Sequence, residues 1–151
     1  MINCPFCKIE ENLDNEVILY KDDIVLAFMD IRQINIGEVL VIPKRHVKNI
    51  FGLSEKELTA ISKVVQLVAN AVRKSFSAEG VMIYQLNGKT QEIPHLHIHI
   101  IPRYKDDEYS KVMSKIINEN KSQKFISSIE DRREYAKRII ATLQSTSPNS
   151  G

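Results

Sequence analysis

The sequence contains no tryptophan and only two cysteines, five glycines and five prolines among its 151 residues. So little glycine and proline, with 43% hydrophobic residues, is typical of one globular domain and not of a disordered chain. No apolar run approaches the roughly 18 residues of a membrane-spanning helix. The start of the chain, Met1 to Pro5, also lacks the basic and then apolar pattern of a secretion signal. We therefore expect a cytoplasmic protein with no membrane partner.

A strong charge of either sign is also absent. Lys and Arg number 21 against 19 Asp and Glu, which gives a formal net charge of +2. This excess is too small for the dense basic field that binding to a nucleic-acid backbone needs. The composition therefore predicts no nucleic-acid partner and is compatible with a small anionic ligand.

The apolar periodicity predicts five strands and one long helix. A capping box at Ser54 to Glu57 starts the helix, which we expect to run to about Phe76. Its apolar stripe should pack on a sheet; the stripe comprises Leu58, Ile61, Val64, Val65, Val68, Val72 and Phe76. The β-rich runs are 17–20, 24–28, 38–42, 81–86 and 95–101, and we expect Pro102 to end the last of them. The fold class predicted is α+β, an antiparallel β-sheet meander of about five strands with one long helix packed on it.

The C-terminal third of the chain has a different pattern. We expect residues 1–104 to form the main domain and residues 105–144 to form a helical extension packed on it. In the second helix Ile129, Ala136, Ile140 and Leu143 should face the body of the domain. The basic residues of this helix are interspersed with acidic ones, which favours a solvated face over a polyphosphate-binding site. These basic residues are Arg132, Arg133, Lys137 and Arg138. Residues 145–151 are small and polar, and we expect a disordered tail.

Three of the four histidines alternate along the last strand. Side chains of a strand change face at every residue, so His95, His97 and His99 should share one face. Successive histidines on that face should lie roughly 6.6 Å apart along the strand. One phosphate could then meet more than one ring. Imidazole suits this role because near pH 7 one ring can attack while another, protonated, offsets negative charge. A three-histidine metal site and plain solvent-facing histidines are the alternatives that the residues leave open.

The two cysteines, Cys4 and Cys7, form a Cys-x-x-Cys pair. Such a pair can be a redox motif, half of a zinc site or two inert thiols. A thioredoxin-like redox site needs a strand before the cysteines, and only three residues precede Cys4 here. The redox interpretation is therefore disfavoured, and a structural zinc would need two further nitrogen or sulfur ligands.

The segment His95-Leu-His-Ile-His-Ile-Ile101 resembles the His-x-His-x-His-apolar-apolar signature of the histidine triad (HIT) family. Upstream segments resemble the family in order and spacing, so the resemblance covers about residues 4 to 103. These segments are Cys4 to Ile9, Leu26 to Ile31, Leu40 to His46, Asn87 with Gln91, and Ile101 to Arg103. The resemblance implies the HIT fold for residues 1–104.

The resemblance also implies a reaction. His97, the middle histidine, would attack the α-phosphorus of a nucleotide and form a covalent nucleotidyl-histidine, which water then hydrolyses to a nucleoside monophosphate. His99 would touch the phosphate, and the Gln91 amide would be a further donor to its oxygens. A neutral imidazole attacks without first losing a proton, and the bond it makes is labile, so a difficult displacement is split into two easier ones.

Further residues match nucleotide-binding positions of similar proteins. Asp30 would accept hydrogen bonds from the ribose hydroxyls, with a turn-capping aspartate as the structural alternative. Asn87 would reach the phosphate region, with an ordinary turn asparagine as its alternative. The loop before the triad departs from the family, because Asn87 and Gln91 are only four residues apart and Thr90 replaces the usual glycine. The base pocket would be lined by Phe6, Ile9, Phe28 and Ile31, residues of a kind that also form ordinary core.

Some bacterial-type relatives that keep the cysteine pair bind structural zinc through two cysteines and two histidines, and the resemblance implies Cys4, Cys7, His46 and His95 as the ligands here. In the alternative, His46 and His95 hydrogen-bond the backbone or each other. Relatives are commonly homodimers. The predicted function is hydrolysis of nucleoside 5′-phosphoramidates or dinucleoside polyphosphates, with AMP as the bound product. Nucleotidyl transfer and a non-catalytic zinc-stabilised nucleotide-binding module are the alternatives.

Overall fold

The computed structural model describes residues 4–12, 17–119 and 128–146. It divides into two compact units, residues 1–111 and 112–151, which are described separately. Within the described residues, no helix is both long and apolar enough to cross a membrane. The N-terminal segment contains the 3-10 helix η1 (Pro5–Lys8) and the short helix α1 (Ile9–Asn12).

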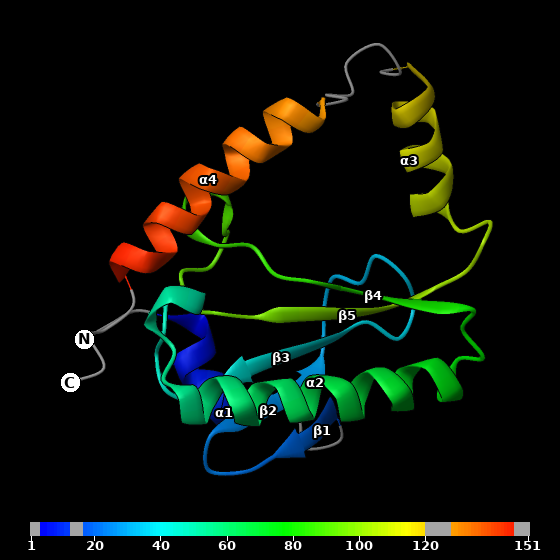
Figure 1. Cartoon of the computed structure of the whole chain (residues 1–151). Coiled ribbons are helices and arrows are strands. Elements are labelled where there is room, and N and C mark those ends of the chain that lie inside the picture. Colours follow the sequence, from blue (N-terminus) through cyan, green and yellow to red (C-terminus); the bar gives the residue numbers. More distant parts are fainter. Residues whose placement is uncertain (1–3, 13–16, 120–127, 147–151) are drawn as a thin grey trace. The chain divides into compact units, whose positions relative to one another are not determined.

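The first unit is built on a five-stranded antiparallel sheet with the order β1-β2-β3-β5-β4 (Figure 1). The first three strands form the predicted meander. The last two form an antiparallel pair, and the second of them, β5, is the one that joins β3. The strands are β1 (Ile18–Lys21), β2 (Val25–Met29), β3 (Val39–Pro43), β4 (Gly80–Tyr84) and β5 (Ile98–Arg103).

The long helix α2 (Glu55–Ser75) crosses one face of the sheet (Figure 1). Its predicted capping box is present, because Ser54 accepts from the backbone of Glu57 and Glu57 accepts from the backbone of Ser54. Of the predicted apolar stripe, the middle of the helix is buried, whereas Leu58 and Phe76 at its two ends are 45% and 37% exposed. The buried apolar positions are Ile61, Val64, Val68 and Val72.

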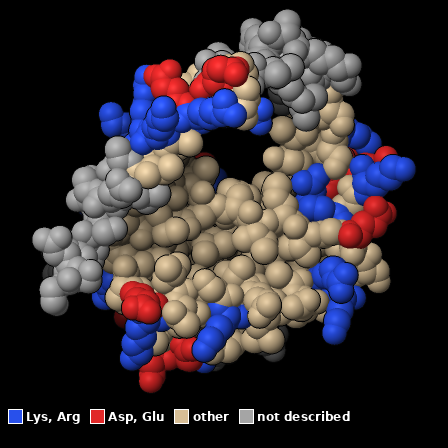
Figure 2. All heavy atoms as spheres, in the orientation of Figure 1, with Lys and Arg blue, Asp and Glu red and all other residues tan. Residues whose placement is uncertain are grey.

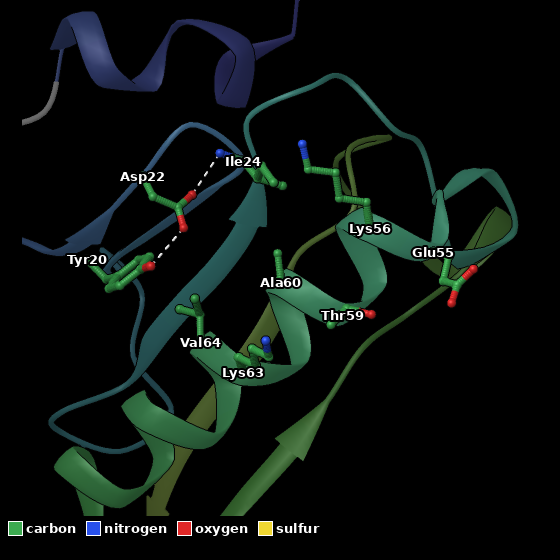
Figure 3. Close-up of a pocket in the computed structure, with 9 residues that line it drawn as sticks. All are labelled: Tyr20, Asp22, Ile24, Glu55, Lys56, Thr59, Ala60, Lys63 and Val64. Atoms are coloured by element: carbon green, nitrogen blue, oxygen red, sulfur yellow. Dashed lines mark hydrogen bonds between the residues drawn. The ribbon is translucent and has the colours of Figure 1, made fainter.

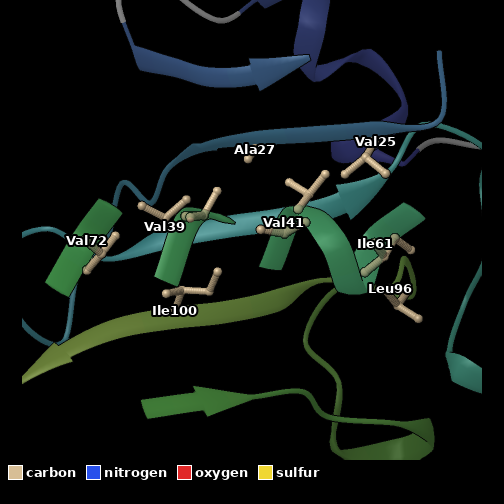
Figure 4. Close-up of a cluster of buried hydrophobic side chains, with 10 residues drawn as sticks. Val25, Ala27, Val39, Val41, Ile61, Val72, Leu96 and Ile100 are labelled. Carbon is tan, nitrogen blue, oxygen red and sulfur yellow. The ribbon is translucent and has the colours of Figure 1, made fainter. Parts of the chain in front are cut away.

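The main core lies between α2 and the sheet (Figure 4). Alternate residues of β2 and β3 face α2, and the residues between them face the other side, where Phe6 and Ile9 cover them. Both faces are therefore buried, which explains why β2 and β3 read as continuous apolar runs. The core residues drawn with labels are Val25, Ala27, Val39, Val41, Ile61, Val72, Leu96 and Ile100.

The strand predicted at 95–101 is displaced along the chain. Residues 95–97 precede β5, which begins at Ile98 and continues through Pro102 to Arg103. Pro102 is tolerated because the pairing of β5 with β3 ends at Ile100, so that Pro102 faces β4 on one side only. On the other side, the Pro102 carbonyl accepts a hydrogen bond from the Asn35 side chain at 2.8 Å.

One glycine is required by the fold. Gly37, which precedes β3, has φ of +101°, and a Cβ there would lie 2.5 Å from the Phe76 ring. Glycine therefore serves both the backbone conformation and the close approach to the end of α2.

The described connections after α2 are the 3-10 helix η4 (Gly88–Thr90) and, beyond β5, α3 (Glu108–Glu119). A second 3-10 helix, η3 (Ile50–Gly52), precedes α2. The second unit contains α4 (Ile129–Thr146), in which Ile129 and Ile140 are 45% and 51% exposed. Residues 145 and 146 of the predicted tail belong to α4, and residues 147–151 lie outside the described residues.

Candidate active site and metal centre

A cavity of about 500 Å³ lies on the face of the sheet opposite α2. It is lined from β2 and β3 and by the segment that begins at Pro5, which brings Phe6 and Ile9 over the strands. Its walls combine apolar side chains with histidines and carboxylates, the mixture expected of a small-molecule site. Seven of the sequence-predicted site residues line it, namely Phe6, Ile9, Phe28, Asp30, Ile31, His97 and His99.

The rings of His97 and His99 lie in this cavity with their centroids 5.1 Å apart. Nδ1 of His97 is 2.7 Å from the carbonyl oxygen of His95, and because a carbonyl can only accept, Nδ1 carries the hydrogen. Nε2 of His97 is then the nitrogen that holds the free lone pair. Burial lowers the pKa of His97 below its usual value, which favours the neutral ring that can act as a nucleophile.

The sequence analysis missed Glu38, which is 1% exposed and lies beside His99. Nδ1 of His99 donates to the Glu38 carboxylate at 2.8 Å and lies 3.8 Å from the Asp30 carboxylate. The Tyr84 ring stacks on His99 at 4.2 Å, with an angle of 5° between the planes. A signal was present in the sequence, because an acidic residue opens the otherwise apolar segment that becomes β3.

Asp30 follows β2 at the edge of the cavity. One of its carboxylate oxygens accepts from the backbone N–H of Arg32 at 2.9 Å, which is the turn-capping contact of the structural alternative. The other oxygen lies 3.8 Å from Nδ1 of His99. The capping contact therefore occupies one oxygen, and the second remains inside the cavity that Asp30 lines.

The structure does not bring Asn87 and Gln91 to the cavity wall. The Asn87 side-chain oxygen accepts from the Ile50 backbone and from the Gln85 side chain. The Gln91 side chain donates to the Lys48 carbonyl at 2.7 Å and accepts from the Gly88 backbone at 2.9 Å. Both side chains brace the short loop before the triad, so their roles at phosphate stay predictions.

Cys4, Cys7, His46 and His95 converge at a second place, and none of them lines the cavity. One ligand atom from each lies within 4.8 Å of all the others. The Cys4 sulfur is 3.4 Å and the Cys7 sulfur 3.7 Å from Nδ1 of His95, and Cys7 is 3.2 Å from Nδ1 of His46. In a tetrahedral zinc site, sulfur and nitrogen ligands stand about 3.6 Å apart, so these four atoms fit the ion.

The surroundings of these four residues also suit a cation. Desolvation and the neighbouring Cys4 raise the pKa of the Cys7 thiol, because two adjacent thiolates repel each other without a positive charge between them. His95 is fully buried, and its Nε2 donates to the Pro43 carbonyl at 2.8 Å. That bond leaves Nδ1 without hydrogen and directed at the sulfurs, as a metal ligand requires.

A second groove, of about 530 Å³, lies between the β1–β2 hairpin and α2 (Figure 3). It contains none of the histidines. The Asp22 carboxylate inside it is already bonded to the Tyr20 hydroxyl and to the Ile24 and Val25 backbones. These contacts close the hairpin turn and give the Asp22 carboxylate a structural role.

The sheet, the helix and a His-x-His-x-His segment beside a small-molecule cavity together define a histidine triad protein. The model of the HIT domain matches residues 11–106, and the chain belongs to this family. A HIT family protein from Bacillus anthracis is 31% identical, with a TM-score of 0.76 over 97% of this chain and 99% of its own. An uncharacterised HIT-like protein of Saccharolobus solfataricus is 33% identical over 93% of this chain and 98% of its own.

Other relatives bear on the metal and the chemistry. A zinc-bound histidine triad protein of Mycobacterium smegmatis is 31% identical, with a TM-score of 0.64 over 71% of this chain and 79% of its own. An adenylylsulfatase of Arabidopsis thaliana is 34% identical over 70% of this chain and 54% of its own length. A bis(5′-nucleosyl)-tetraphosphatase of Schizosaccharomyces pombe is 38% identical over 60% and 50%. The family thus includes nucleotide hydrolases, and the predicted family and fold class are confirmed.

Proposed function

We propose that this protein is a nucleotide hydrolase that acts at the α-phosphorus of nucleoside 5′-phosphoramidates or dinucleoside polyphosphates. Nε2 of His97 attacks phosphorus, the bond to the leaving group breaks, and water then cleaves the nucleotidyl-histidine to release a nucleoside monophosphate. The observation that carries the proposal is the pair of rings 5.1 Å apart in one cavity, with the His97 hydrogen held on Nδ1 by the His95 carbonyl.

The rest of the cavity supports a nucleotide as the occupant. Phe6 and Phe28, whose ring centroids are 6.0 Å apart, offer an aromatic corner for a base. Asp30, which lines the same cavity, would accept from the ribose hydroxyls. His99 would donate to the phosphate oxygens where negative charge grows in the transition state.

The test is release of AMP from adenosine 5′-phosphoramidate and from diadenosine polyphosphates. Rapid acid-free quenching with substrate labelled at the α-phosphate should trap label on the wild-type protein and none on His97→Ala. A matched control is Thr59→Ala on α2, which lines the second groove and should trap label as the wild type does. AMP release by His97→Ala at the wild-type rate would refute the proposal, and tight AMP binding without turnover would favour a non-catalytic module.

A structural zinc ion held by Cys4, Cys7, His46 and His95 is part of the proposal. Four protein ligands close the coordination shell, so the ion would stabilise the fold and supply no reactive water. It would join the N-terminal segment, the end of β3 and the start of the triad segment. Protein purified without chelator should contain about one zinc per chain by elemental analysis, and a content near zero would refute this part.

A homodimer is also part of the proposal. A groove of about 460 Å³ between α2 and β4 is lined mainly by apolar side chains, and β4 is an edge strand with one unpaired side. On the side of the molecule where α2 lies, Figure 2 shows mostly uncharged side chains across the middle. Ile83→Lys on β4 should yield a monomer by light scattering, whereas Leu19→Lys on the opposite edge strand should not; both positions are about half exposed. A monomeric wild type would refute the dimer.

A further inference from the structure

Glu38 is a buried acid that the proposed reaction does not use. It is 1% exposed and directly precedes β3, the strand that pairs with β5. Removing a carboxylate from water costs several kcal/mol unless its oxygens are hydrogen-bonded. Its partners should therefore explain why an acid is kept at this position.

Both carboxylate oxygens of Glu38 accept hydrogen bonds. Oε2 accepts from the Ile34 backbone N–H at 2.5 Å, and Oε1 accepts from Nδ1 of His99 at 2.8 Å. An ionised carboxylate can only accept, so the hydrogen of the second bond belongs to Nδ1 of His99. Nε2 is then the ring nitrogen of His99 that is available to a ligand in the cavity.

We propose that Glu38 is a positioning residue that holds the hydrogen of His99 on Nδ1, so that Nε2 meets the phosphate of the bound nucleotide. This inference rests on the proposed function, because it assigns a role within the same site. A proton that Nε2 carries toward phosphate gives the ring a positive charge, and the buried carboxylate on the far side balances it. Glu38 thereby acts through His99 and does not itself touch the nucleotide.

Two further residues, Tyr84 and Asp30, lie next to the His99 ring. The Tyr84 ring stacks on it at 4.2 Å and 5°, which fixes the plane of the imidazole. Asp30 lies 3.8 Å from Nδ1, beyond hydrogen-bonding distance, so Glu38 is the acceptor of that hydrogen. The orientation of the ring and the site of its hydrogen are thus set by different residues.

The substitution Glu38→Gln tests this arrangement sharply, because glutamine offers one acceptor and one donor where Glu38 offers two acceptors. The backbone N–H of Ile34 can only donate, so the amide oxygen should turn to it and the NH2 group to His99. His99 must then accept at Nδ1 and carry its hydrogen on Nε2. The substitution therefore reverses the tautomer with almost no change in side-chain volume.

The experiment combines two-bond nitrogen–proton NMR of the ring-labelled histidines with steady-state kinetics on adenosine 5′-phosphoramidate. In the wild type, the His99 signals should be those of hydrogen on Nδ1, and in Glu38→Gln those of hydrogen on Nε2. We expect kcat to fall about 10- to 100-fold, as for other groups that orient a functional histidine, with KM changed by less than about threefold. Glu38→Asp keeps the charge and should restore the wild-type tautomer with part of kcat.

The control is Glu57→Gln, which changes another buried carboxylate of the same type, one bonded to Arg45 and outside the cavity. It should leave the His99 signals and kcat unchanged. A wild-type spectrum of neutral His99 with hydrogen on Nε2 and none on Nδ1 would overturn the proposal without any variant, even if Glu38→Gln does not fold. An unchanged tautomer and kcat in folded Glu38→Gln would also overturn it. If His97→Ala keeps full activity, the proposed function fails as well; if His97→Ala is inactive, only this inference does.

Discussion

His95 and His97 are two residues apart, yet their side chains occupy surroundings of opposite kinds. His95 lies among two thiols and the His46 ring, whereas His97 lies in the cavity beside His99, Asp30 and Glu38. Each ring has one nitrogen bonded to a backbone carbonyl, but not the same nitrogen. His95 uses Nε2, toward Pro43, and His97 uses Nδ1, toward the carbonyl of His95.

The two carbonyls therefore assign opposite tautomers to neighbouring histidines. His95 presents Nδ1 as a lone pair to the sulfurs, and His97 presents Nε2 as a lone pair to the cavity. In His99 a carboxylate replaces the carbonyl as the acceptor. The comparison indicates that the chemistry of each histidine follows from which nitrogen the fold occupies, since the residue type is the same at all three positions.

Removing each ring in turn tests most directly whether His95 serves the metal site and His97 the reaction. His97→Ala should lower kcat on the order of 10⁴-fold, because no nucleophile remains, and should leave zinc content unchanged. His95→Ala should instead lower zinc content and thermal stability, with a smaller loss of kcat per folded molecule. Metal analysis, thermal unfolding and AMP release on both variants measure the separation. Equal loss of activity in the two would mean that the regions are not distinct.

Removal of the metal is expected to have the next largest effect. Chelation, or Cys4→Ser, should lower the free energy of unfolding by about 4 kcal/mol, the value for a ligand present at a thousand times its dissociation constant. The loss should be reversed by adding zinc to the chelated wild type but not to Cys4→Ser. Urea unfolding with and without chelator measures it. A chelator-insensitive wild type would mean that these thiols hold no stabilising metal ion.

The sequence predicted the class of each site because spacing carries that information. A Cys-x-x-Cys pair and alternating histidines can be recognised in the sequence alone, and the apolar periodicity predicts the antiparallel sheet and α2. The order of the last two strands could not be predicted, because either β4 or β5 could have paired with β3. The last strand also begins later than predicted, because the backbone N–H groups of His95 and Leu96 bond to the carbonyls of Ile93 and Val47, which lie outside the strands.

The roles of Glu38, Asn87 and Gln91 depend on hydrogen bonds between distant segments. Glu38 reaches His99 across 61 positions, and Gln91 reaches the Lys48 carbonyl across 43. No local pattern encodes such a pairing. A polar residue in a strand or a turn has many acceptable partners, and only the tertiary arrangement selects one.

A smaller effect is expected within the cavity, at Asp30. If its free carboxylate oxygen binds the ribose, Asp30→Asn should raise KM for adenosine 5′-phosphoramidate about tenfold or more, as for other hydrogen bonds to charged groups. The wild type should prefer the ribonucleotide over the 2′-deoxynucleotide, and Asp30→Asn should lose most of that preference. Asp23→Asn, in the β1–β2 turn, is the control. An unchanged preference would mean that Asp30 is only the turn cap that Arg32 indicates.

The smallest effect is expected at Glu57, the second of the two buried carboxylates. Glu57, unlike Glu38, is bonded to a guanidinium, with Arg45 Nε at 2.6 Å, and this bond is the main reason its pKa is lowered from 4.5 to about 2. Because the folded pKa is the lower one, the stabilisation is present above pH 4.5 and is lost as pH falls from about 4.5 to about 2.

Glu57→Gln should therefore cost on the order of 1–2 kcal/mol of unfolding free energy at pH 7, a modest value because the Arg45 side chain is 58% exposed to solvent. The difference from wild type should shrink as pH falls from about 4.5 toward 2, because the Glu57 carboxyl is then protonated in the unfolded state and becomes protonated in the folded state as well. Urea unfolding of both proteins from pH 7 to pH 3 measures it. A difference that stayed constant over that range would assign the loss to packing at the start of α2 and not to the ion pair.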